Sequence, residues 1–139
     1  MLTTCGNEHG HLVLRGGSRS GPNYSVEHIA QAVALLQKAA VPSAILVDCS
    51  HANSGKRYDQ QPAVARDVAG QIAAGQRAII GVMLESHLVA GSQSVVSGQP
   101  LTYGQSITDG CLAFDDVVPV LEDLAQAVRT RRQQLLLIK

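Results

Sequence analysis

The most informative segment of this 139-residue chain reads Ile45-Leu46-Val47-Asp48-Cys49-Ser50-His51-Ala52-Asn53-Ser54-Gly55-Lys56. An apolar, β-branched run ends abruptly in an acid, a serine and a histidine, and then passes into a small polar loop. Buried parallel strands have this pattern when they deliver functional side chains at their carboxyl ends. The segment therefore predicts a strand over 44–48, followed by a functional loop that contains His51.

Two similar apolar runs flank this segment, and each also ends in a charged residue. Residues 11–15 end in Arg15 before a Gly-Gly turn, and residues 78–84 lead into Glu85. Arg15, His51 and Glu85 are spaced roughly 35 residues apart, which is the period of βα units in a parallel sheet. Strand alternation places Arg15, His51 and Glu85 on the same sides of their strands as Val13, Val47 and Gly81, respectively. If these three sides face the same way, the three strand ends converge on one pocket.

Helical patterns separate the strands, so the chain is predicted to be α/β. The first helix begins at the N-cap Ser25, and the second lies between Pro62 and Gly75. A last helix is expected from about Asp115 to Arg132. Residues 86–113 form a loop far longer than usual, with Asp109 near its end. The apolar positions expected to face the core are Ile29, Val33, Leu36 and Ala40 in the first helix, Val64, Val68 and Ile72 in the second, and Val118, Leu121, Ala125 and Val128 in the last.

The composition excludes several classes of protein. Eleven basic and eleven acidic residues give no net charge, and aromatic residues are only 3% of the chain, so we expect no nucleic-acid partner. No leader and no apolar run of membrane-spanning length is seen, so no membrane association is expected. Three cysteines fit no paired framework and indicate a reducing, cytoplasmic location. Residues 1–139 are read as one domain with no second domain.

Three separated residues form a possible ligand set. His51, Glu85 and Asp109 offer the nitrogen and oxygen atoms that suit Mn²⁺, Fe²⁺, Co²⁺ or Zn²⁺. The alternative is that His51 caps a loop, Glu85 forms a buried ion pair and Asp109 caps a turn. Arg15 could fork onto a phosphate or carboxylate, helped by free N–H groups of Gly16 and Gly17, or could pair with a neighbouring acid.

Five other side chains near these positions also have two interpretations. Asp48 is expected to orient a neighbour, not to bind a metal directly. Lys56 and Arg57 either add positive charge at the mouth of the site or belong to a solvated loop. Cys49 shares the parity of His51, but a buried free cysteine is the commoner case. His87 either lines the site or bonds locally within its loop.

Four ordered motifs resemble one family, the type I 3-deoxy-7-phosphoheptulonate (DAHP) synthases, the first enzymes of the shikimate pathway of aromatic amino acid biosynthesis. The motifs are His11-Leu-Val-Leu-Arg-Gly-Gly17, Val47-Asp-Cys-Ser-His-Ala-Asn-Ser54, Ala78-Ile-Ile-Gly-Val-Met-Leu-Glu-Ser-His-Leu88 and Tyr103-Gly-Gln-Ser-Ile-Thr-Asp-Gly-Cys111.

This resemblance implies a (β/α)₈ barrel and a transferase that joins phosphoenolpyruvate to erythrose 4-phosphate with release of phosphate. By position, His51, Glu85 and Asp109 resemble three of four catalytic metal ligands, and Arg15 resembles an arginine that holds phosphoenolpyruvate. The metal would act as a Lewis acid.

The chain also departs from the family pattern. The fourth metal ligand, a cysteine from an early strand, has no counterpart here, and neither does the Lys-Pro-Arg-Thr motif for erythrose 4-phosphate. The opening residues resemble an interior position of the family. We therefore expect the carboxyl-terminal three βα units of an incomplete barrel, without appreciable activity as an isolated chain.

Two alternatives remain open. The first is a non-catalytic fragment that assembles with an amino-terminal piece or, as a homo-oligomer, with itself through its open strand edges. The second is a small metal-dependent hydrolase that uses His51, Glu85 and Asp109 with a water, in which case Cys49 would have to be a further ligand.

Overall fold

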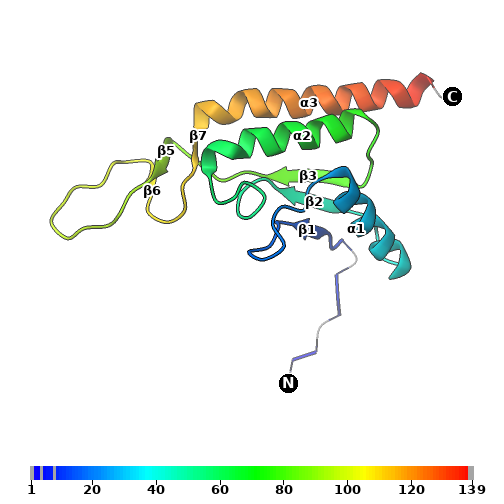
Figure 1. Cartoon of the computed structure of the whole chain (residues 1–139), viewed down its shortest axis with the longest axis horizontal. Coiled ribbons are helices and arrows are strands. Elements are labelled where there is room, and N and C mark those ends of the chain that lie inside the picture. Colours follow the sequence, from blue (N-terminus) through cyan, green and yellow to red (C-terminus); the bar gives the residue numbers. More distant parts are fainter. Residues whose placement is uncertain (1, 4, 8, 138–139) are drawn as a thin grey trace.

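A computed structural model describes residues 2–3, 5–7 and 9–137 of the chain. Three parallel strands form the central sheet in the order β1-β2-β3, and three longer helices accompany it (Figure 1). A short 3-10 helix, Tyr58–Gln60, precedes α2. The main elements are β1 (Leu12–Leu14), α1 (Val26–Lys38), β2 (Ile45–Asp48), α2 (Gln61–Ala73), β3 (Ile79–Met83) and α3 (Phe114–Leu137).

The predicted start of the first helix and the predicted span of the second are confirmed, because local signals fix them. The first helix ends at Lys38, and the predicted core position of Ala40 is wrong: Ala40 lies beyond the helix in a left-handed conformation (φ +55°) and is exposed. The Ser25 hydroxyl caps α1 by accepting the N–H of His28. Pro62 lies in the first turn of α2, where its missing N–H costs nothing. Gly75 follows this helix with φ +106°, a conformation in the left-handed half of the map that glycine tolerates best.

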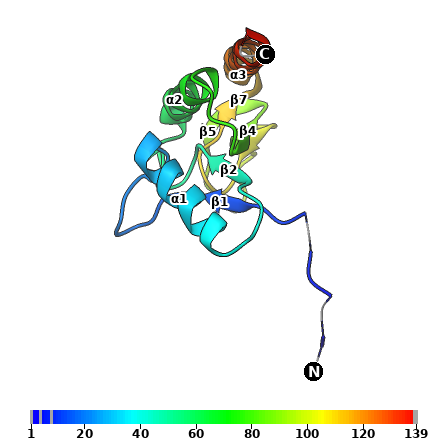
Figure 2. The same ribbon diagram turned by 90° about the vertical axis from the view of Figure 1, so that its right-hand side faces the viewer.

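The helices α1 and α2 cover the same face of the sheet (Figure 2). This follows from the strand order, because successive right-handed crossovers between neighbouring strands place their helices on one side. Ile45 and Val47 are fully buried against these helices. On the other face Val13 is 44% exposed and Ile80 is 59% exposed, so no layer of the described part of the chain covers this apolar sheet face.

The strand register corrects one expectation about side-chain direction. Leu14 pairs with Val47, and Val13 pairs with Leu46, so Val47 and Cys49 lie on the helix face while Val13 lies on the open face. The condition that Val13 and Val47 face the same way is therefore not met. Asp48, one residue further along β2, is the one that shares the direction of Val13.

The last helix is longer than predicted and is rotated about its axis. It continues past Arg132 to Leu137, because the intervening residues are good helix formers and Arg131 bonds to the Gln76 carbonyl at 2.8 Å. The predicted burial of Val118, Leu121 and Ala125 is wrong: all three are exposed. The side chains that face α2 and the sheet instead are Val117, Val120, Leu124 and Ala127.

The helix register is set by the segment that enters it. Leu112 is only 3% exposed and belongs to β7 (Leu112–Ala113), which leads directly into α3. The helix then packs alongside α2, where Arg66 and Asp123 form an ion pair at 3.1 Å. These tertiary contacts choose the buried face among several apolar ones, and Val128 remains half-buried.

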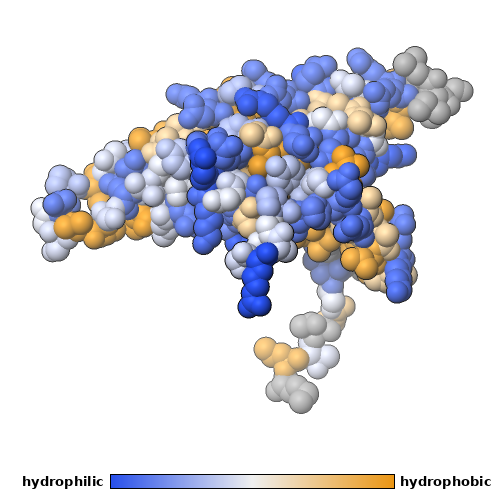
Figure 3. All heavy atoms as spheres, in the orientation of Figure 1, coloured by the Kyte–Doolittle hydropathy of each residue, from blue (hydrophilic) through white to orange (hydrophobic). Residues whose placement is uncertain are grey.

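The long loop is confirmed as non-helical, but it has structure of its own. It forms an arm that extends away from the sheet in Figure 1. Apolar side chains gather along this arm (Figure 3), including Val95, Val96 and Leu101. Two short parallel pairs hold its base: β4 (Ser86–His87) with β7, and β5 (Val89–Ser92) with β6 (Gln105–Ser106).

Candidate metal centre

His51, Glu85 and Asp109 come together at the carboxyl ends of the strands. One potential ligand atom from each lies within 4.8 Å of the others. His51 follows β2, Glu85 follows β3 and Asp109 follows β6. They border a cavity of about 240 Å³, whose remaining lining residues are Arg15, Ser50, Lys56 and Gly110.

The route by which His51 reaches this cavity differs from simple strand alternation. The strand ends at Asp48, and His51 adopts φ +49° in the following turn. Its carbonyl accepts the N–H of Lys56 at 2.7 Å, which closes the loop back on itself. The loop therefore swings the imidazole from the helix side of the sheet toward the open side.

Asp48 fixes the orientation of this imidazole. Its Oδ2 lies 2.7 Å from His51 Nδ1, and its Oδ1 accepts the Ser50 N–H at 2.8 Å. An ionised carboxylate only accepts hydrogen bonds, so in the neutral imidazole the proton is assigned to Nδ1 and the lone pair to Nε2. This is the arrangement found for metal-binding histidines, and it matches the orienting role expected for Asp48.

Glu85 is held through both its side chain and its backbone. Ser50 Oγ donates to Oε2 at 2.5 Å, which leaves Oε1 facing His51 Nε2 at 3.8 Å. The Gln61 side chain, fully buried at the start of α2, accepts the Glu85 N–H at 2.7 Å and donates to its carbonyl at 3.1 Å. Gln61 was not predicted to support the site, because no local signal links it to a residue 24 positions away.

Asn53 is a second support that the sequence did not reveal. Its side-chain amide donates to the carbonyls of Leu14, at 3.0 Å, and Asp48, at 2.7 Å. Its oxygen accepts the N–H of Asn23 at 2.8 Å. One buried amide thus ties together the ends of β1 and β2, and its only sequence signal is a polar residue in the loop after a strand.

Asp109 is the most exposed member of the cluster. The adjacent segment is held by two bonds between Gly91 and Cys111, and the Cys111 thiol donates to the Asp109 carbonyl at 3.6 Å. Gly110 lies against Tyr58, since a Cβ at this position would be 2.7 Å from the ring. The base of the arm thus sets the position of Asp109.

Arg15 borders the same cavity and a neighbouring one of about 330 Å³. The expectation that the N–H groups of Gly16 and Gly17 are free is wrong. Gly16 donates to Asn23 Oδ1 at 2.7 Å and Gly17 donates to the Gly21 carbonyl at 3.0 Å, because the turn closes on itself. Within the described residues, no carboxylate lies within 4.0 Å of the Arg15 guanidinium, so the ion-pair alternative has no support.

Cys49 lies on the other side of the sheet. Its thiol is fully buried beside Val64 and Val120 and donates to the Val47 carbonyl at 3.9 Å. Burial, and then the nearby Asp48, raises the pKa of the Cys49 thiol to about 12. This neutral core thiol gives no support to the hydrolase alternative that requires Cys49 as a ligand.

The remaining candidates have local roles. Arg57 forms an exposed ion pair with Asp59 at 2.7 Å, and the Arg57 hydrogen bond lowers the pKa of that carboxyl. His87 Nδ1 accepts the N–H of Leu88 at 2.8 Å, in keeping with local bonding within its loop. Lys56, by contrast, borders both cavities around Arg15.

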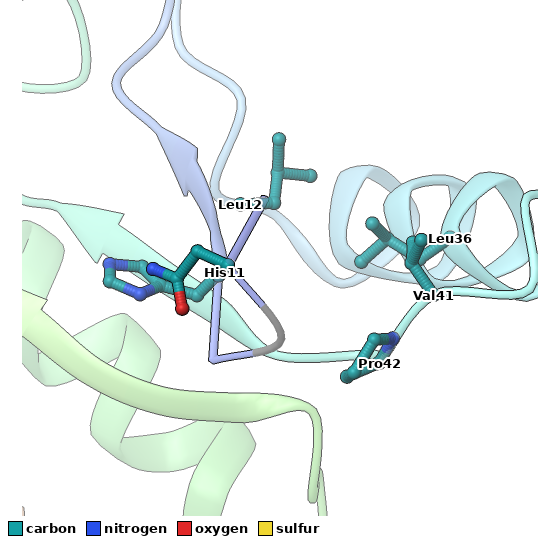
Figure 4. A pocket seen from close by; sticks show the side chains of 7 residues that line it. His11, Leu12, Leu36, Val41 and Pro42 are labelled. Carbon is teal, nitrogen blue, oxygen red and sulfur yellow. The ribbon is translucent and has the colours of Figure 1, made fainter. Parts of the chain in front are cut away.

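A larger cavity of about 400 Å³ lies at the opposite end of β1 (Figure 4). His11 and Leu12 line it together with Leu36, Val41 and Pro42, from the end of α1 and the turn that follows. The described residues of its walls are mainly apolar and include no cluster of ionisable groups, so these walls offer binding volume without the chemistry of the first site.

In the part of the chain that the structure describes, none of the helices combines the length and the apolar character required of a membrane span.

A one-sided parallel α/β sheet with an imidazole and two carboxylates at its carboxyl edge defines an α/β protein with a candidate divalent-metal centre. Comparison with known proteins narrows this class. The model of the DAHP synthetase I family matches residues 1–122, and the chain belongs to that family.

Individual relatives agree with the family assignment and show how much of a whole family member the chain covers. The Phe-sensitive phospho-2-dehydro-3-deoxyheptonate aldolase of Escherichia coli K12 is 50% identical over 95% of this chain, which covers 37% of the relative. The Haemophilus influenzae aldolase is 47% identical over 96% of the chain and 36% of its own length. A solved Francisella tularensis aldolase matches 92% of the chain and 37% of its own, with 48% identity and a TM-score of 0.87. The chain thus spans little more than a third of these relatives.

Proposed function

We propose that this chain supplies the carboxyl-terminal part of a DAHP synthase, a transferase that condenses phosphoenolpyruvate with erythrose 4-phosphate and releases phosphate. The observation that carries this proposal is the cluster of His51, Glu85 and Asp109 beside Arg15, in a chain of the DAHP synthetase I family. The names of the relatives, which are phospho-2-dehydro-3-deoxyheptonate aldolases, support it.

The proposed context is an incomplete (β/α)₈ barrel to which residues 1–139 contribute one partial domain. Helices on one face only and an uncovered apolar face are the features of a barrel wall, and they support this context. A complete barrel takes about 250 residues. The partner is then either a polypeptide with the missing units or a second copy of the chain.

The donor set fits a divalent metal such as Mn²⁺, Fe²⁺, Co²⁺ or Zn²⁺. His51 Nε2, Glu85 Oε1 and a carboxylate oxygen of Asp109 would hold it, while Asp48 and Ser50 keep the first two atoms turned inward. Three protein ligands leave coordination positions open, as catalytic sites require. When bound, the metal would polarise a substrate carbonyl as a Lewis acid.

Arg15 is proposed to bind the anionic end of phosphoenolpyruvate. Its guanidinium borders the cavity of the ligand cluster and offers a planar fork for a phosphate or carboxylate. The three free cysteines support a reducing, cytoplasmic setting for this chemistry. Positioning and charge stabilisation supply most of a catalytic effect, so the isolated chain is expected to lack turnover.

The test is phosphate release from phosphoenolpyruvate and erythrose 4-phosphate in the presence of Mn²⁺. We expect none from the pure chain, and release when the unmatched part of the E. coli relative is added. His51→Ala should abolish that release, whereas His87→Ala, in the arm base, should not. Turnover by the isolated chain would contradict the incomplete barrel, and a folded, associated mixture without turnover would contradict the proposed activity.

A further inference from the structure

We propose that Lys56 is a second anion-binding residue of this site, which with Arg15 holds the phosphate group of a phosphate-monoester substrate. This role rests on the proposed function and extends it to a subsite beside the ligand cluster. The subsite is the cavity of about 330 Å³ bordered by Arg15, Gly16, Gly17, Ser18, His51, Ala52 and Lys56.

The two cavities adjoin, because Arg15, His51 and Lys56 border both of them. A ligand that fills the second cavity therefore lies next to the His51 imidazole of the ligand cluster. Lys56 and Arg15 have no carboxylate within 4.0 Å among residues 2–3, 5–7 and 9–137. The neighbouring cation Arg57 is paired with Asp59, whereas Lys56 and Arg15 are the two Lys/Arg side chains that line this cavity.

The two glycines beside the cavity cannot supply the anion contacts through their backbone N–H groups. Both glycine N–H groups beside the cavity are engaged, that of Gly16 by Asn23 and that of Gly17 by Gly21. We therefore expect a phosphate in this cavity to be bound mainly by the guanidinium of Arg15 and the ammonium of Lys56, with the Ser18 hydroxyl as a further donor. Arginine gives a two-pronged contact and lysine a compact charge with three donors, which together suit a dianion.

The loop fixes where Lys56 stands relative to the metal ligands. Lys56 has φ +60°, a left-handed conformation uncommon for a residue with a side chain, and it follows Gly55 at φ +63°. Its N–H donates to the carbonyl of His51 at 2.7 Å. The residue that carries the ammonium is thus bonded directly to the residue that carries the imidazole.

Calorimetry of the full, metal-free chain with inorganic phosphate tests this proposal. We expect Lys56→Ala and Arg15→Ala each to weaken phosphate binding about tenfold, the order for one charge-assisted hydrogen bond. Lys56→Arg should restore most of the affinity, and Arg57→Ala, next in the chain but paired elsewhere, should leave it unchanged. Phosphoenolpyruvate and erythrose 4-phosphate, titrated separately, reveal which of the two monoesters depends on Lys56.

Two results would overturn the role of Lys56: equal phosphate affinity of Lys56→Ala and the unaltered chain, or no phosphate binding by the unaltered chain. A parallel Mn²⁺ titration separates this outcome from failure of the proposed function. Lys56→Ala should still bind Mn²⁺. If Mn²⁺ binding is intact but the phosphate affinity does not depend on Lys56, only the subsite is refuted. Circular dichroism of each variant checks that the fold is retained.

Discussion

His51 illustrates how single residues determine this site. Its place in the chain made it a candidate ligand, but the path it takes depends on φ +49° and on the turn that closes at Lys56. Strict alternation would have turned it toward the helices, with Val47 and Cys49. The residue types and their positions at strand ends could be read from the sequence, whereas the turn geometry could not.

Asp48 provides a direct test of ligand orientation. Replacing it with asparagine substitutes an N–H₂ group for one of the two oxygens that bind His51 Nδ1 and Ser50 N. We expect Asp48→Asn to weaken Mn²⁺ binding by about 10- to 100-fold, as losses of such supporting carboxylates do. Asp59→Asn, which removes an exposed loop carboxylate paired only with its own loop, is the control; equal effects of the two changes would contradict this role.

Cys49 predicts a pH dependence of stability. Burial raises the pKa of its thiol from 9.0 to about 12, so the folded chain keeps a proton that the unfolded chain releases. This contribution to stability is complete below about pH 9 and is lost as the pH rises toward 12. Relative to Cys49→Ala, the unaltered chain should lose about 1 kcal/mol of unfolding free energy between neutral pH and pH 10. Urea titrations at each pH measure the free energy of unfolding. The same pH dependence of this free energy in the unaltered chain and in Cys49→Ala would contradict the raised pKa of the buried thiol.

At the scale of elements, the start of α1 and both ends of α2 were predictable because Ser25, Pro62 and Gly75 mark them locally. The rotation of α3 was not, since Val117 and Val118 are equally apolar and only the packing on α2 chooses between them. Likewise β4 and β7 pair across the whole arm, and pairing at that separation has no local signature. Helix ends with local signals were therefore predicted, whereas two features determined by tertiary contact, the buried face of α3 and the pairing of β4 with β7, were missed.

Gly16 connects β1 and Arg15 to the loop that follows them. The effect of an added side chain at Gly16 on stability can be compared with that at a second glycine, Gly70. It has φ +70°, and a Cβ there would lie 2.9 Å from both the Ala52 Cβ and the Gly21 carbonyl oxygen. Gly16→Ala should therefore destabilise the chain by about 2 kcal/mol. Gly70→Ala, in α2 with no atom within 4 Å of the added carbon, should stabilise it by up to about 1 kcal/mol. Thermal unfolding measures both changes. If the unfolding temperatures of Gly16→Ala and Gly70→Ala shift in the same direction, the predicted difference between the two glycines is contradicted.

At the scale of the whole molecule, two apolar surfaces lack a partner within the described structure. One is the open face of the sheet with Val13 and Ile80, and the other is the stripe of Phe114, Val118 and Leu121 on α3. Large exposed apolar areas usually mark interaction surfaces. The chain covers 37% of its E. coli relative, and the remaining units of a barrel are the partner we propose for the open face.

We expect this chain alone to assemble a metal site from three distant loops. Calorimetric titration of the purified chain with Mn²⁺ tests it most directly, with His51→Ala as the test variant and His87→Ala as the matched control. Binding of one Mn²⁺ per chain, lost in His51→Ala and kept in His87→Ala, is the predicted result. Absence of binding, or equal binding by both variants, would mean that His51, Glu85 and Asp109 do not form a metal site in this chain.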